Sequence, residues 1–159
     1  MMSKHANSLR KKIAEPIRTT NGGDRMNTGF LDDLGKLFFR LGFGVLFLMH
    51  GIDKVMNIDG TLQGIGTMLA NAGLPAELAY GVFIGEILAP ILIIIGWHAR
   101  IGAVLTLITM GFAIYLAHSH ELLLLTQHGG WQLELQGMFV LAGILIALSG
   151  PGRISINGR

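Results

Sequence analysis

One apolar stretch in the first third of the chain carries four basic or imidazole side chains that share a helical face. At about 100° per residue they fall at about 0°, 40°, 320° and 0° around a helix axis: Lys36, Arg40, His50 and Lys54. Phe43 and Phe47 fall on the same stripe. Such a face can offer positive charge, hydrogen bonds and flat apolar surface to one ligand. Charged side chains are costly in contact with lipid, so we expect this face of the helix to point into a helix bundle.

A glutamate, Glu86, lies inside a second apolar stretch, about 12 Å from its outer end by the rise of an α-helix. By the same rise, His50 lies about 6 Å below Lys54 and Arg40 about 21 Å below it, so Glu86 falls between His50 and Arg40 in depth. An unpaired carboxylate there is costly, so we expect Glu86 to be paired or protonated. Glu86 is therefore a candidate for a ligand-binding or proton role, and His50 and Lys54, one turn apart on one face, can both reach one site near the outer leaflet.

Each of these groups also has a simpler structural interpretation. Arg40 can extend its guanidinium to the nearby interface. Glu86 can be a structural partner of Arg40 or His50 that holds two helices together. Four polar residues near the ends of apolar stretches are expected to be interfacial: His118, His120, His128 and Glu134. We predict that they form no metal site.

Four apolar stretches must position these groups. Each is close to the ~20 residues that a helix needs to cross the hydrocarbon core of a bilayer: about 34–52, 78–97, 101–118 and 132–149. A segment in lipid must satisfy its own backbone hydrogen bonds, and these stretches show no strand-like alternation, so helix is expected. The sequence therefore predicts an all-α membrane protein with a bundle of four transmembrane helices.

Composition supports this class and excludes others. The 159 residues are 51% hydrophobic and only 14% charged, against roughly 25% charged in soluble domains, and the mean hydropathy is +0.55. The absence of cysteine excludes disulfides, Cys-ligated zinc and iron–sulfur clusters bound by the chain's own thiolates. The basic residues lack interleaved aromatics, so no nucleic-acid partner is expected.

The distribution of Lys and Arg predicts the orientation. The positive-inside rule places both termini in the cytoplasm and leaves only Lys54 outside. Residues 1–33 are expected to be a basic, disordered cytoplasmic extension that precedes the membrane domain at 34–156. The apolar run lies too far from residue 1 for a cleaved signal peptide, and Met26 is an alternative start of the working protein.

The first outer loop, about 53–77, has an amphipathic pattern of its own. Helical spacing joins Leu62, Ile65, Leu69 and Ala72, which predicts a short helix that lies on the outer surface and is ended by Pro75. Within the second stretch, Gly81, Gly85 and Ala89 form a ridge of small residues that lets a neighbouring helix approach, and Pro90 is expected to kink the helix.

The first stretch and its flanks contain a family motif. The run R-L-G-F-G-V-L-F-L-M-H-G-I-D-K leads from Arg40 to His50, Gly51 and Lys54. It resembles the first helix of the DoxX family, which runs from an arginine to H-G-x-x-K. Glu86 in G-E-I-L matches that family's intramembrane glutamate. Further similar segments bring the resemblance to about residues 34–156: A-G-L-P (72–75), G-W-H-A-R (96–100), G-G-W (129–131) and G-P-G-R-I-S (150–155). A departure is Asn157, where the family often has an acidic residue.

The resemblance implies a four-helix protein of the bacterial inner membrane. Some relatives are subunits of quinone-linked enzymes, notably thiosulfate:quinone oxidoreductase, and others are similar to components of complexes that handle oxidative stress. We therefore expect a redox-associated subunit, acting as a homo-oligomer or with a partner redox protein, that binds a quinone or quinol headgroup near the outer leaflet.

In this hypothesis each candidate residue has a role. His50 hydrogen-bonds a ring oxygen, and Glu86 accepts or releases the proton. Lys54 and Arg40 tune Glu86 and stabilise negative charge on the reduced ring, and Phe43 and Phe47 line the pocket. Haem is a less favoured cofactor, because it needs facing histidines.

Two other functions remain open. The chain can be a non-catalytic assembly or scaffold subunit of a membrane complex, with the buried charges joining its helices. A small transporter or channel is favoured less, because four short spans with one glutamate form a pore only in an oligomer.

Overall fold

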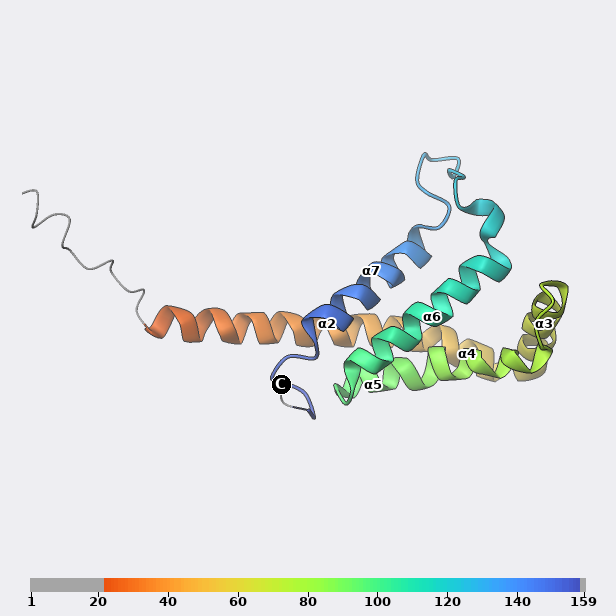
Figure 1. Ribbon diagram of the computed structural model, residues 1–159. Coiled ribbons are helices and arrows are strands. Elements are labelled where there is room, and N and C mark those ends of the chain that lie inside the picture. The colour runs from red at the N-terminus through yellow and green to blue at the C-terminus, as the bar shows by residue number, and fades with distance from the viewer. Residues whose placement is uncertain (1–21, 158–159) are drawn as a thin grey trace, which may run out of the picture. The chain divides into compact units, whose positions relative to one another are not determined.

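A computed structural model describes residues 22–157 of the chain (Figure 1). The chain divides into two units, residues 1–32 and 33–159, and each is considered by itself. In the first unit only 22–32 are described, and they form the first turns of a helix. The second unit contains every candidate residue.

The described residues form helices and connecting turns, and their single β-type contact is an isolated bridge between Leu125 and Trp131. The longest helices are α2 (Gly22–Met56), α3 (Ile58–Asn71), α6 (Ala99–Ala117) and α7 (Glu134–Ser149). Between α3 and α6 runs a composite helix, made of η1 (Ala76–Tyr80), α4 (Gly81–Phe83), η2 (Ile84–Leu88) and α5 (Ala89–Ile95). A short turn, η3 (Ser119–Glu121), follows α6.

Three segments are long and apolar enough to cross a membrane: Gly29–Met56, Ala76–Ile95 and Ala99–Ala117. They confirm three of the four predicted spans. The fourth, α7, is apolar but shorter, with 16 residues. The prediction that both termini are cytoplasmic stays a prediction.

Helix α2 begins at Gly22, before the predicted first span at 34, and so runs through part of the predicted basic extension. Residues 1–21 of that extension lie outside the described residues. The predictions of disorder there and of a start at Met26 remain predictions.

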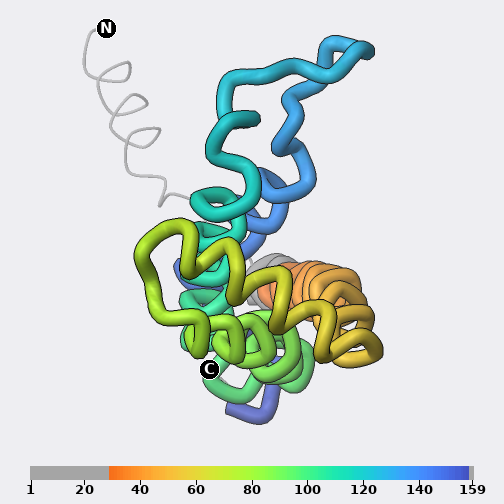
Figure 2. Tube along the Cα trace, turned by 90° about the vertical axis from the view of Figure 1, so that its right-hand side faces the viewer, coloured from red at the N-terminus to blue at the C-terminus, as the bar shows by residue number. Residues whose placement is uncertain are grey.

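Helix α6 packs against α5 and α7, and it lies between them in Figures 1 and 2. The contact with the composite helix uses the predicted ridge in part. A side chain on Gly85 would meet Thr109 of α6, and one on Gly102 would meet the carbonyl oxygen of Ala89, whereas Gly81 has open space around it. Gly85 and Ala89 therefore set the close approach of the two helices.

The core joins α2, α5, α6 and α7. Its members are all apolar and buried: Phe43, Phe47, Ile93, Ala99, Ala103, Met110, Phe139 and Ile146. Outside it, large apolar side chains are exposed along the predicted spans, such as Phe38, Val45, Ile108 and Leu141. A chain with so much exposed apolar surface requires a lipid or protein environment.

The helix predicted within the first loop is present as α3, and its position on the outer surface stays a prediction. Its Leu69 and Gly66 are buried. It ends at Asn71, and Gly73 follows with a left-handed backbone (φ 74°), so the glycine turn ends the helix before Pro75 does.

The C-terminal segment after α7 is anchored by Arg40. The guanidinium is buried and donates hydrogen bonds to the carbonyl oxygens of Pro151 (2.9 Å) and Ile154 (3.0 Å). Its Nε has no hydrogen-bond partner among the described residues. Gly96, with φ 71°, leaves room for the guanidinium, because a side chain there would collide with it. Arg40 thus holds residues 150–156 against the bundle instead of reaching into solvent.

Replacing Arg40 with methionine is expected to release this segment. The segment would lose two partly buried hydrogen bonds from a charged donor, each of which contributes about 1.5–3 kcal/mol, so residues 150–156 should exchange amide hydrogen faster and be cleaved sooner by protease. Arg153→Ala is the control, because this side chain is 84% exposed and its Nε lies 3.9 Å from Asp33, a geometry that contributes little. Equal protection of the segment in both variants would contradict the anchoring role.

Candidate functional site

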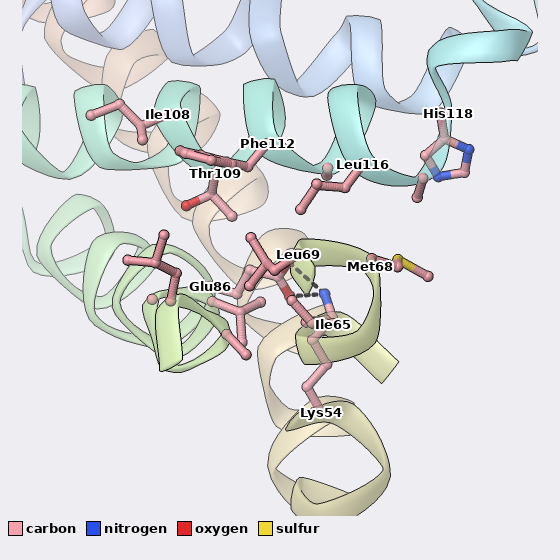
Figure 3. Close-up of a pocket in the computed structure, with 16 residues that line it drawn as sticks. Lys54, Ile65, Met68, Leu69, Glu86, Ile108, Thr109, Phe112, Leu116 and His118 are labelled. Carbon is pink, nitrogen blue, oxygen red and sulfur yellow. Dashed lines mark hydrogen bonds and ion pairs between the residues drawn. The ribbon is translucent and has the colours of Figure 1, made fainter. Parts of the chain in front are cut away.

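An ion pair inside the bundle joins Lys54 of α2 to Glu86 of η2. Lys54 Nζ donates hydrogen bonds to both carboxylate oxygens of Glu86, as the dashed lines in Figure 3 show. The Glu86 side chain is 4% exposed and that of Lys54 is 30% exposed. Glu86 therefore has the partner that its depth requires, but this partner is Lys54 and not Arg40 or His50, which the sequence suggested as structural partners.

The backbone around Glu86 explains its position. Pro90 lies four residues later and has no N–H to donate to the Glu86 carbonyl, so an α-helical hydrogen bond is missing there. The chain responds with one wide π turn over Ile84–Leu88, in which the N–H of Ala89 donates to the carbonyl of Ile84. Wide turns of this kind are frequent at functional sites. The proline predicted to kink the helix thus produces the turn that carries the glutamate.

Gly51 brings α2 close to this turn. An added side chain at Gly51 would collide with the carbonyl oxygen of Glu86, so the two backbones are in contact only because residue 51 is glycine. Lys54 lies one helical turn further along α2, within reach of the Glu86 carboxylate. The H-G-x-x-K motif therefore has a physical role: its glycine permits the approach and its lysine completes the ion pair.

A pocket of about 400 Å³ borders this ion pair. Its walls come from α3, the composite helix and α6, and they are mainly apolar, with Ile65, Met68, Leu69, Ile108, Phe112 and Leu116 among them (Figure 3). Four lining residues have polar side chains: Lys54, Glu86, Thr109 and His118. The volume lies within the range of small-molecule sites, about 300–1,000 Å³.

The polar groups of the pocket differ in how far they are already satisfied. The Thr109 hydroxyl donates to the carbonyl of Leu105 (3.0 Å). An ammonium group has three N–H donors, and Glu86 accepts from Lys54 through two oxygens. One donor of Lys54 is therefore left for a further acceptor. A ligand with an oxygen at the end of an apolar or aromatic body matches this arrangement.

The structure does not gather all the predicted residues at this pocket. His50, Phe43 and Phe47 contact Phe139 of α7, with ring centroids 5.4, 5.9 and 5.0 Å from the Phe139 ring. The Nδ1 atom of His50 lies 3.0 Å from the carbonyl oxygen of Leu46. Arg40 is bound to the C-terminal segment. Of the six candidates, only Lys54 and Glu86 line the pocket.

His118, predicted from the sequence to be interfacial, lines the pocket at the end of α6. Its Nδ1 lies 2.8 Å from a carboxylate oxygen of Glu121. The i, i+3 spacing of histidine and glutamate was visible in the sequence, but the pocket that His118 borders was not. Across residues 22–157, no cluster of three or more acidic or imidazole groups is placed to bind a metal ion.

Comparisons with known proteins agree with the motif. The DoxX family model matches residues 35–119, more than half of the chain and the part that holds Lys54 and Glu86. "Putative oxidoreductase CatD" of Bacillus subtilis (strain 168) is 34% identical over 89 residues, which are 56% of this chain and 62% of that protein. "Inner membrane protein YphA" of Escherichia coli (strain K12) is 30% identical over 126 residues, 77% of this chain and 88% of that protein.

No solved structure matches the chain. The chain spans less than two thirds of the Bacillus relative and most of the Escherichia relative. Taken with the three helices that can cross a bilayer, the match to an inner membrane protein identifies a multi-pass protein of the inner membrane. By the extent of these matches, the chain belongs to the DoxX family.

Proposed function

We propose that the chain is a redox-associated subunit of the inner membrane that binds a quinone or quinol headgroup in the pocket beside Lys54 and Glu86. The observation that carries this proposal is an apolar pocket of about 400 Å³ with one buried ion pair in its wall. The name of the Bacillus relative, "Putative oxidoreductase CatD", favours a redox role.

The residues present suit such a ligand. A quinone has a flat ring with oxygen substituents and an apolar tail, and the pocket offers the Phe112 ring and aliphatic side chains to the apolar parts. The remaining N–H of Lys54 would donate a hydrogen bond to a ring oxygen. Lys54 orients the Glu86 carboxylate, which would hold a proton at one of its oxygens when the ligand takes up or releases one.

When bound, the quinone supplies the electron-transfer chemistry, and the electrons come from a partner redox protein. The chain's own residues bind and orient the ring, exclude water with apolar walls and handle a proton at Glu86. If both termini are cytoplasmic, the pocket lies toward the outer leaflet, since Lys54 follows the outer end of the first predicted span.

The geometry changes the assignment of roles from the sequence-based hypothesis. Lys54 and Glu86 keep their roles as ligand-binding and proton-handling groups. His50 and the two phenylalanines pack against Phe139, and Arg40 holds the C-terminal segment, so the proposal assigns these four no contact with the ligand.

Filling the pocket tests the proposal without touching the ion pair. Gly81 lines the pocket and has open space where a side chain would begin, so Gly81→Leu should place four carbons in the ligand's volume. We expect the affinity for a short-chain alkyl 1,4-benzoquinone to fall by tenfold or more. A tenfold fall corresponds to a loss of about 1.4 kcal/mol of binding free energy. The measurement is quenching of tryptophan fluorescence in purified protein reconstituted in nanodiscs.

The matched control is Gly111→Leu. Gly111 also has open space around it and lies on α6, but it does not line the pocket. Its variant should bind the quinone as the wild type does. If the wild-type protein does not bind quinone, or if both variants bind it equally well, quinone binding in this pocket is wrong.

A second function, that of a non-catalytic assembly subunit, has its own supporting observation. Both Glu86 oxygens accept hydrogen bonds from Lys54. Such a pair needs no ligand, because joining α2 to the composite helix is a sufficient role for it. In that case Gly81→Leu would leave the yield of the partner complex unchanged, and removal of one member of the ion pair would lower it, because the other charge would stay buried without its partner.

A further inference from the structure

The pocket has a second polar feature besides the ion pair. His118 lines it at the C-terminal end of α6, and Figure 3 shows its ring apart from Lys54 and Glu86, beyond Leu116 along the helix. A ligand that fills the pocket would therefore meet polar groups at two separate places.

Glu121 fixes which nitrogen of His118 carries the hydrogen. The Nδ1 atom lies 2.8 Å from Glu121 Oε2. A carboxylate accepts hydrogen bonds and donates none, so Nδ1 must be the donor in this contact. In the neutral imidazole the other nitrogen, Nε2, is then an acceptor. Within residues 22–157, Nε2 of His118 has no hydrogen-bond partner.

The two polar groups of the pocket therefore require different hydrogen-bonding groups of a ligand. The ammonium group of Lys54 donates and suits an oxygen that accepts, which both a carbonyl and a hydroxyl can do. Nε2 of a neutral His118 accepts and suits a hydroxyl, which a quinone lacks and a hydroquinone has. The difference gives the pocket a means of distinguishing the two redox states of the same ring.

We propose that His118, positioned by Glu121, accepts a hydrogen bond from a ring hydroxyl of the bound ligand, so that the pocket binds the hydroquinone more tightly than the quinone. The proposal rests on the proposed function, because it takes the ligand class from it. His118 becomes a binding residue and Glu121 a positioning residue.

The chain provides a control for both residues. His120 also lies near Glu121, with Nε2 3.5 Å from Oε1, but its side chain is 72% exposed and it does not line the pocket. A substitution of His120 therefore changes the charge and polarity near Glu121 without changing the pocket.

The test compares the affinities of one alkyl hydroquinone and its quinone under anaerobic conditions, in nanodiscs. For the wild type we expect a preference for the hydroquinone of about 3- to 10-fold, the range that one neutral hydrogen bond gives. His118→Phe, which keeps a planar ring, should remove the preference, and His120→Phe should retain it. Glu121→Ala should reduce the preference, and Glu121→Gln should restore it, because the amide oxygen can accept from Nδ1.

The outcomes separate this inference from the proposed function. If the wild type binds neither form, the proposed function fails. If it binds the ring without preference, prefers the quinone, or keeps the hydroquinone preference in His118→Phe, the inference fails and quinone binding stands. Should His118→Phe not fold, His118→Leu gives the same comparison, and the Glu121→Ala and Glu121→Gln pair tests the proposal without a change to the lining of the pocket.

Discussion

Replacing Lys54 with methionine is expected to lower the yield of folded protein in the membrane strongly. The double variant Lys54→Met/Glu86→Leu should restore much of that yield. The single substitution leaves the carboxylate of Glu86, 4% exposed, without its partner. Removing one member of a buried ion pair costs about 3–5 kcal/mol, because the other charge stays buried and uncompensated. Replacing both by apolar groups of similar size is often close to neutral.

The measurement is the yield of monodisperse protein after detergent extraction and a series of heating steps, compared among the wild type, both single variants and the double variant. Glu77→Leu is the control for the change of glutamate to leucine, because Glu77 is exposed in η1. We expect this variant to behave as the wild type does. A double variant as unstable as Lys54→Met would mean that the two residues do not stabilise the fold as a pair.

The double variant also separates the two candidate functions. Its bundle should assemble, but it has neither the spare donor of Lys54 nor the proton-handling carboxylate. If the chain binds quinone, the variant should be folded and unable to bind it tightly. If the chain is an assembly subunit, the same variant should still support the partner complex. Stability and ligand affinity therefore need to be measured on the same preparation.

The sequence predicted that Glu86 needs a partner but offered Arg40 or His50 as the structural one, whereas the structure pairs Glu86 with Lys54. His50, Arg40 and Lys54 fall within about 80° of one another on a helical wheel, so periodicity places all of them on one face. The selection depends on where the neighbouring helices touch α2. Gly51 contacts the composite helix at Glu86, whereas His50 contacts Phe139 of α7, and these are tertiary facts that no local pattern contains.

Arg40 shows the same limit at longer range. Its depth and charge indicated a partner inside the bundle, and the bonds it makes are to backbone carbonyls 111 and 114 residues away in the chain. Every residue has a backbone carbonyl oxygen, so the residue types in the sequence do not show which carbonyls will accept hydrogen bonds from Arg40. The G-P-G-R-I-S segment that supplies them was identified only as part of the family motif.

The local backbone features were closer to prediction. Apolar periodicity predicted α3, and the stretch at 78–97 predicted the composite helix. Pro90 predicted an irregularity, and its distance of four residues from Glu86 explains why the irregularity is a π turn at that glutamate. Propensity and spacing act within one helix, so they can be derived from the sequence, whereas the pocket needs α3, α6 and the composite helix together.

Replacing Gly51 with alanine adds only one carbon atom, but it should destabilise the fold more than most substitutions of that size in this chain. The added methyl group would collide with the backbone carbonyl of Glu86, and a backbone atom cannot turn away as a flexible side chain can. Overpacking in a core costs about 1–3 kcal/mol and more where the backbone must move. Here the movement would also separate Lys54 from Glu86, so the two losses add.

Gly42→Ala provides the matched control, since Gly42 lies on the same helix and has no atom within 4 Å of an added methyl group. In that position alanine should be neutral or stabilise the helix, by up to about 1 kcal/mol, because it restricts the unfolded chain. We expect a lower midpoint of thermal unfolding and a loss of quinone affinity for Gly51→Ala, and neither for Gly42→Ala. Equal behaviour of the two variants would mean that α2 can move away from η2 at little cost. The H-G-x-x-K motif would then owe its glycine to something other than the approach of these two backbones.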